Sequence, residues 1–285
     1  MIVKHMTNLR IVYEIIRKIY MVFRMKKVSR NSATVALHYN SGSWQKKLDS
    51  FNKYKTTPNS LEGFLFEKQF ASQTGLKRKL KLVNCEKLMF IEEEKYLEYK
   101  AKRLAKCIGE KYSNVLEIGC GYGWNLAVLR LYGFKGGLNG IDISKNGIEL
   151  SRKISSHFSL NLHTQVKDIH ELDRKFTADF KIDLILIYQV LEQLPNSTEQ
   201  VLNKLIEIFP KTKFLIIESA AELFPTNLNL LLTRFYNYKQ NYQNSVLRVC
   251  KNLAHAEKIT EFKSNRYNCS GKYGHESLKI EFVSS

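Results

Sequence analysis

The residues best suited to chemistry follow a short apolar run in the middle of the chain. Glu117 stands near the end of that run, and three glycines, Gly119, Gly121 and Gly123, follow it at alternate positions. Glycines at such a turn let the backbone approach a ligand closely, and a helix that begins there offers unpaired N–H groups. Asp142 ends the next apolar run, 25 residues after Glu117, where a carboxylate can bind ribose hydroxyls. The pattern indicates a nucleotide-like ligand.

The spacing of the glycines narrows the choice of ligand. A dinucleotide-binding loop has the pattern G-x-G-x-x-G, but Trp124 holds its last position and the final glycine comes one residue earlier, at Gly123. With Glu117 two residues before Gly119, the loop resembles the E/D-x-G-x-G-x-G loop of class I S-adenosylmethionine-dependent methyltransferases. The resemblance extends over residues 86–283, includes a terminal hairpin that dehydrogenases lack, and implies S-adenosylmethionine as the cofactor.

The resemblance also implies roles for residues at the ends of successive strands. Glu117 belongs to the loop around the methionine moiety, and Asp142 matches the ribose-binding acid. Asp168 matches the acid that accepts a bond from the adenine amino group, with Ile169 against the ring; its alternative role is to cap the helix that follows. Tyr188 is expected beside the reactive sulfonium. The expected cofactor-binding residues are Glu117, Gly119, Cys120, Gly121, Gly123, Asp142, Ile143, Asp168, Ile169 and Tyr188.

The segment after Tyr188 narrows the class of methyl acceptor. It is similar to the V-L-E-H-L segment of small-molecule members of the family, except that Gln193 stands where His is usual, which removes one candidate base. The Pro-Pro motif typical of enzymes that methylate nucleobase amines is absent there, as are a Pro-Cys pair and the paired glutamates of arginine methyltransferases. The resemblance therefore implies a small-molecule acceptor.

A general base is expected on the last loop. Ligands lie outside the carboxyl ends of parallel strands, and an antiparallel final strand brings the loop 268–276 to the same edge. Because transfer to a hydroxyl requires removal of its proton, we expect catalytic roles for His275, Glu276 and Tyr188, with Glu276 or Glu218 orienting the histidine. The alternative for His275 is an ordinary surface position, and an acidic acceptor would need no base.

Short apolar runs alternate with helical segments and position these residues. The alternation predicts βαβ units with right-handed crossovers. The fold class is therefore α/β, a Rossmann-like, doubly wound, mostly parallel seven-stranded sheet that ends in an antiparallel hairpin and carries a helical N-terminal extension. Strands are expected at 114–118, 138–143, 161–166, 182–188, 213–218, 259–266 and 278–283, and helices at 86–108, 124–132, after Ser144 and at 199–209.

Three regions are expected along the chain. Residues 1–28 form a basic amphipathic helix with three alternative uses: contact with an anionic membrane, targeting, or docking on the rest of the protein. Residues 29–85 form a partly helical cap or lid, in which Tyr39 and Trp44 either cover the substrate or fill the core. Residues 86–285 form the methyltransferase domain, with 220–257 inserted on the substrate side.

The charge balance favours an anionic partner. The chain has 45 Lys+Arg against 27 Asp+Glu, a net charge of +18, which suits a membrane surface, nucleic acid or a phosphorylated substrate, or is simply a solvated lysine surface. Five cysteines without a C-x-x-C pair argue against a disulfide framework and a zinc site and favour a reducing compartment. We expect a cytoplasmic protein without metal or transmembrane segment, in peripheral contact with a membrane at most.

The function expected from these observations is S-adenosylmethionine-dependent methyl transfer to an oxygen or nitrogen of a small metabolite, with a sugar or glycan precursor as the preferred class. An RNA or protein methyltransferase is the first alternative, because of the net charge and the basic cluster at 77–79. A non-catalytic protein that binds S-adenosylmethionine is the second. The sequence makes no prediction of the oligomeric state.

Overall fold

A seven-stranded sheet forms the centre of the molecule. The computed structural model describes residues 12–13, 16–17, 19–30, 32–53, 60–66, 78–83, 87–177, 181–194, 197–224, 226, 228–267 and 277–285. The strand order is β5-β4-β3-β6-β7-β9-β8, with the first five strands parallel and β9 antiparallel to both β7 and β8. The strands are β3 (Asn114–Ile118), β4 (Gly137–Asp142), β5 (Leu162–Val166), β6 (Leu184–Tyr188), β7 (Lys213–Ser219), β8 (Ile259–Tyr267) and β9 (Ser277–Ser284).

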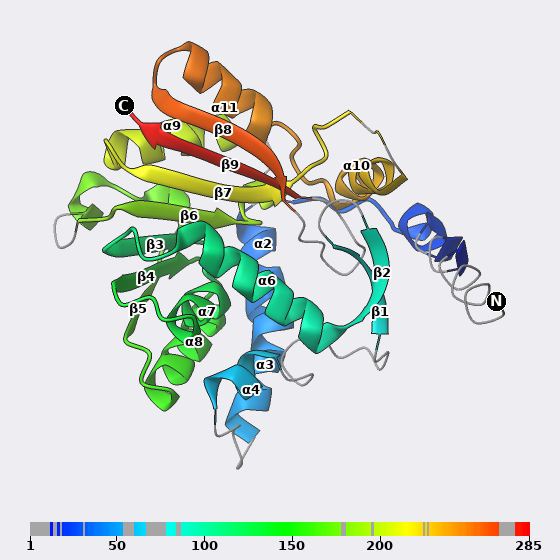
Figure 1. Cartoon of the computed structure of the whole chain (residues 1–285), viewed down its shortest axis with the longest axis horizontal. Coiled ribbons are helices and arrows are strands. Elements are labelled where there is room, and N and C mark those ends of the chain that lie inside the picture. The colour runs from blue at the N-terminus through cyan, green and yellow to red at the C-terminus, as the bar shows by residue number, and fades with distance from the viewer. Residues whose placement is uncertain are drawn as a thin grey trace.

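Helices cover both faces of this sheet, as the strand sequences require. In β6, Leu184 and Leu186 pack into one hydrophobic cluster while Ile185 and Ile187 pack into the other, so the strand is apolar at every position. One face is covered by α6 (Glu93–Ile108), α7 (Trp124–Leu131) and α8 (Lys145–His157), and the other by α9 (Thr198–Ile208) and α11 (Val246–His255) (Figure 1). The predicted doubly wound α/β fold with its antiparallel end is confirmed.

The region before the sheet contains helices and one hairpin. It has α2 (Ser32–His38), a π-helical turn (Tyr39–Ser43), α3 (Trp44–Lys53), α4 (Leu61–Phe66), and the antiparallel strands β1 (Arg78–Val83) and β2 (Lys87–Glu92). The helix expected at 86–108 therefore begins only at Glu93. Residues 87–92 pair with β1 instead, since an apolar run of that length suits a strand as well as a helix.

The elements at the carboxyl ends of the parallel strands enclose the region where a ligand is expected. Figure 1 shows α2, α3 and α10 (Leu228–Gln240) at the end of the sheet toward which β7 points. The expected insertion at 220–257 consists mainly of α10 and α11. Among the described helices, none is long and apolar enough to cross a membrane.

Candidate active site

The glycine-rich loop after β3 has the backbone geometry that its sequence indicates. Gly119, Gly121 and Gly123 have φ values of +70°, +55° and +77°, in the left-handed region that glycine adopts without strain. A Cβ at Gly119 would also overlap the side chain of Val190. The N–H groups of Gly119 and Cys120 both donate to the carbonyl of Ile141, at 2.8 and 2.9 Å, which ties the loop to β4.

Asp142 connects this loop to the following helix. Its Oδ2 accepts a hydrogen bond from the N–H of Gly121 at 2.8 Å, and its Oδ1 accepts one from the N–H of Ser144 at 2.7 Å. Burial raises the pKa of Asp142 although both bonds lower it. Ser144 in turn caps α8 by accepting from the N–H of Gly147. The carboxylate is therefore fixed in position beside the loop.

A cavity of about 500 Å³ lies along the carboxyl ends of the strands. Its lining includes nine of the predicted cofactor-binding residues, namely Glu117, Gly119, Cys120, Gly121, Asp142, Ile143, Asp168, Ile169 and Tyr188. Gly123 is not in the lining and instead precedes α7 as its N-cap. His275 and Glu276 lie outside the described residues, so their catalytic roles stay predictions.

Glu117 lines the cavity with a buried carboxyl group that has only one of its two oxygens hydrogen-bonded in the described part of the chain. Its Oε1 accepts a hydrogen bond from Asn125 at 2.5 Å, while its buried Oε2 has no hydrogen-bond partner among the described residues. Burial raises the pKa of Glu117 to about 8, because a low-dielectric environment disfavours the charged form. A ligand with an ammonium group fits this position, since it supplies both the missing hydrogen bond and the compensating charge.

Asp168 occupies a position that is compatible with both of its alternative roles. Its Oδ1 accepts a hydrogen bond from the N–H of His170 at 2.9 Å and so caps the 3-10 turn Ile169–Glu171. The residue also lines the cavity together with Ile169. The capping role is present in the structure, and contact with adenine stays a prediction.

The segment before the sheet covers the glycine loop. The ring of Trp44 stacks on Tyr39 with centroids 5.5 Å apart, meets Tyr122 edge-on at 5.1 Å and packs over Gly121. Asn40 fastens this segment to α8, because its Oδ1 accepts from the hydroxyl of Ser144 at 2.9 Å. The aromatic residues at 39 and 44 thus close the cavity on one side. Asn40 was not predicted, and no sequence pattern marks it.

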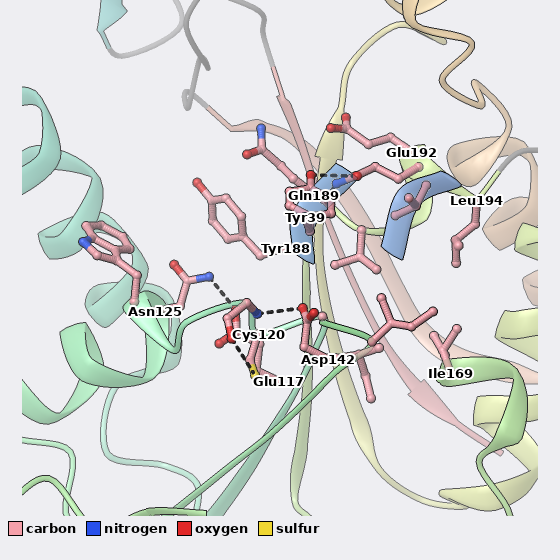
Figure 2. A pocket seen from close by; sticks show the side chains of 18 of the residues that line it. Tyr39, Glu117, Cys120, Asn125, Asp142, Ile169, Tyr188, Gln189, Glu192 and Leu194 are labelled. Atoms are coloured by element: carbon pink, nitrogen blue, oxygen red, sulfur yellow. Dashed lines mark hydrogen bonds between the residues drawn. The ribbon is translucent and has the colours of Figure 1, made fainter. Parts of the chain in front are cut away.

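Tyrosines, amides and one carboxylate line the part of the cavity that lies away from the glycine loop. This Tyr39–Tyr242 half contains Tyr39, Gln189, Glu192, Gln193, Tyr236, Asn237 and Tyr242. Figure 2 shows Tyr39, Gln189 and Glu192 in the upper part of the view and Glu117 and Asp142 below them. The hydroxyl of Tyr39 donates to Oε1 of Gln193 at 2.8 Å, and Nε2 of Gln193 donates to the carbonyl of Gln189 at 2.9 Å. Gln189 has a φ of +56°, a strained conformation for a side chain other than glycine.

Glu192 of this half and the neighbouring Glu218 are both buried. Glu218, at the end of β7, accepts hydrogen bonds from the N–H groups of Val190 and Leu191, each at 2.8 Å, and so holds the turn after β6. Burial and the neighbouring Glu192 raise the pKa of Glu218 well above its usual range. Burial raises the pKa of Glu192 to about 7, against the opposing effect of Arg30. Glu117, Glu192 and Glu218 are the three buried glutamates of the site.

Arg30 brings a positive charge to the edge of this half. Its Nε donates to the carbonyl of Gln240 at 2.8 Å, and its guanidinium lies 4.5 Å from the ring centroid of Tyr242. Neither Glu192 nor Arg30 was predicted from the sequence as a residue of the site. The acid stands in the V-L-E-H-L-like segment and was therefore accessible to sequence reasoning, whereas the arginine is far from it in the chain. No cluster of metal-ligating residues occurs in the described part of the chain.

Comparisons with known proteins agree with this geometry. A family model described as "Methyltransferase domain" matches residues 110–271. The structure is similar to magnesium protoporphyrin IX methyltransferase from Synechocystis with bound SAH, with 12% identity, a TM-score of 0.53, and coverage of 90% of this chain and 100% of that one. A Pyrococcus horikoshii protein has 17% identity and a TM-score of 0.50 over 68% of this chain and 92% of its own. The likeness to these structures shows the fold, and no curated protein matches the sequence.

Proposed function

The chain belongs to the family of methyltransferase domains and uses S-adenosylmethionine, and we propose that it methylates an oxygen or nitrogen of a small metabolite. One observation carries this proposal: the cavity is enclosed on one side by Tyr39 and Trp44 and on another by Tyr236 and Asn237 of α10. Its volume of about 500 Å³ lies within the roughly 300–1,000 Å³ of small-molecule sites. A folded RNA or protein would need an open groove at this place.

We assign the glycine-loop side of the cavity to the cofactor. Bound there, S-adenosylmethionine supplies an electrophilic methyl group on a sulfonium. Asp142 would accept hydrogen bonds from the ribose hydroxyls with the lone pairs that Gly121 and Ser144 leave free. Oε2 of Glu117 would accept the ammonium of the methionine moiety, and Tyr188 would lie beside the sulfonium. Trp44, stacked above the loop, would exclude water from the reacting atoms.

We assign the Tyr39–Tyr242 half to the acceptor. Neutral amides at Gln189, Gln193 and Asn237 offer both donors and acceptors, and tyrosine faces suit the apolar faces of a sugar ring. These side chains support a sugar or glycan precursor as the acceptor. Glu192 is the described carboxylate best placed to take a proton from an acceptor hydroxyl, while His275 and Glu276 remain proposed for the same task on the last loop.

The experiment that tests this proposal uses S-adenosylmethionine labelled in its methyl group. The purified protein is incubated with fractionated metabolite extracts, total RNA and total protein in separate reactions. We expect label in a small-molecule fraction, and a decrease in kcat of at least tenfold for Glu192→Gln, since general-base catalysis typically contributes about 100-fold or more. Label in RNA or protein would reject the small-molecule acceptor. We propose the cytoplasm as the location, supported by the buried thiols of Cys120 and Cys250, which form no disulfide in the described part of the chain.

A further inference from the structure

An exposed apolar stripe runs along the first described helix. Residues 12–13, 16–17 and 19–24 are helical. Tyr13, Ile16, Tyr20 and Phe23 follow one another at helical spacing, and each is between 57 and 63% exposed. An amphipathic helix normally buries such a stripe in its own protein. Here the stripe faces solvent.

The helix α10 continues this surface. Its residues Leu228, Leu231 and Tyr238 are 42, 53 and 56% exposed and share one helical face. The rings of Phe23 and Phe235 pack together with centroids 4.4 Å apart, and the N–H of Val28 donates to the carbonyl of Lys239 at 2.9 Å. Figure 1 shows the two helices side by side. The contact fixes them to each other while their apolar stripes stay uncovered.

The charge around both stripes is predominantly positive, and Glu14 is the single acid in residues 12–48. Neither 15–48 nor 223–256 contains an Asp or Glu. Arg24, Lys26, Lys27 and Arg234 are exposed beside the apolar residues, and the ammonium of Lys27 lies 4.7 Å from the ring centroid of Tyr238. A surface that combines exposed aromatic and aliphatic side chains with a predominantly positive rim is complementary to anionic headgroups above an acyl layer.

We propose that this apolar–basic face, formed by the described residues 12–13, 16–17 and 19–27 and the exposed side of α10, binds the surface of an anionic lipid bilayer. Nucleic acid would engage the cations through its phosphates but would leave Ile16 and Leu231 exposed to water. A second copy of the chain would bring two positive rims together, which is unfavourable. Because binding needs neither cofactor nor acceptor, the inference is independent of the proposed methyl transfer.

The experiment is co-sedimentation of the full chain with vesicles. One set of vesicles is pure phosphatidylcholine and the other contains phosphatidylserine at about one lipid in three. We expect sedimentation with the anionic vesicles that weakens with added salt, since each cation near an anionic surface contributes to binding and is screened by ions. The triple variant Arg24→Gln/Lys26→Gln/Lys27→Gln should bind at least tenfold more weakly. The variant Tyr13→Ser/Ile16→Ser/Tyr20→Ser should lose binding even at low salt.

The matched control removes the same number of exposed cations elsewhere, as Lys106→Gln/Lys135→Gln/Lys175→Gln, and should bind like the unmodified protein. The substituted side chains are exposed, and the one hydrogen bond among these described residues joins Arg24 to the hydroxyl of Tyr20; circular dichroism verifies folding. Equal sedimentation with the anionic vesicles and with the pure phosphatidylcholine vesicles would overturn the proposal. Equal losses in the control and in the Arg24 variant would do so too, and binding to an RNA oligonucleotide without binding to vesicles would favour nucleic acid instead.

Discussion

The ionisation of Glu117 gives the most informative prediction. In the ligand-free protein, burial raises the pKa of this carboxyl to about 8, although the hydrogen bond from Asn125 lowers it. The carboxyl is therefore mostly protonated at pH 6 to 7. An ammonium pairs with the ionised carboxylate, so binding of S-adenosylmethionine must release the proton from Glu117.

The magnitude follows from linkage between protons and ligand. Below a pKa of about 8, each pH unit changes the free energy of ionising the carboxyl by about 1.4 kcal/mol, which is a factor of about ten in affinity. The sign is fixed: affinity rises as pH rises, because less work is needed to ionise Glu117. The amine of the ligand stays protonated between pH 6 and 7, since α-amino groups titrate near about 8, so it does not disturb this range.

Calorimetry measures both consequences. Titrations at pH 6 and pH 7 should give Kd values that differ about tenfold, and titrations in two buffers of different ionisation enthalpy should count about one proton released. Glu117→Gln should remove both effects, whereas Glu192→Gln, on the other side of the cavity, should keep them. A Kd for the unmodified protein that does not change between pH 6 and 7, with no proton release, would refute the pairing of Glu117 with the ammonium.

Three further predictions concern the same site. Asp142→Ala should weaken S-adenosylmethionine binding at least tenfold, about 1.4 kcal/mol; an unchanged Kd in calorimetry would exclude the ribose role. Gly119→Ala forces a side chain into the left-handed region and against Val190, and should destabilise the fold by about 1–3 kcal/mol and lower Tm by several degrees. Gly42→Ala, where a Cβ would meet nothing within 4 Å, is its control and should leave Tm nearly unchanged. The three buried glutamates have raised pKa values and bind more protons in the folded state, so stability of the ligand-free protein should fall between pH 5 and 8; a Tm that rises over this range would contradict it.

The fold was predictable because its signals are local. The strands β6 and β7 each contain at least four consecutive apolar residues, and the glycines after β3 need left-handed backbone that few other residues adopt. The strand at 87–92 was missed, because six residues with apolar positions do not distinguish a strand from the start of a helix. Its pairing with Arg78–Val83 is a tertiary contact.

The cofactor side of the candidate site was predictable residue by residue, whereas the acceptor side was expected only as a cover with Tyr39 and Trp44 and an insertion at 220–257. Glu117, Asp142 and Tyr188 stand at strand ends, where topology alone brings them together. Tyr39 and Tyr242 reach the cavity from segments far apart in the chain, and Arg30 lies beside Tyr242; no spacing rule connects these residues. The acceptor side therefore depends on packing of the N-terminal helices and α10, which a single sequence does not reveal.

A calorimetric titration of the purified full chain with S-adenosylmethionine, with NAD as the control ligand, measures whether the cavity binds the cofactor. We expect micromolar binding of S-adenosylmethionine, about −8 kcal/mol, and no binding of NAD, because the glycine spacing and Trp44 over the loop leave no dinucleotide site. Binding of NAD alone, or of neither ligand, would contradict this expectation.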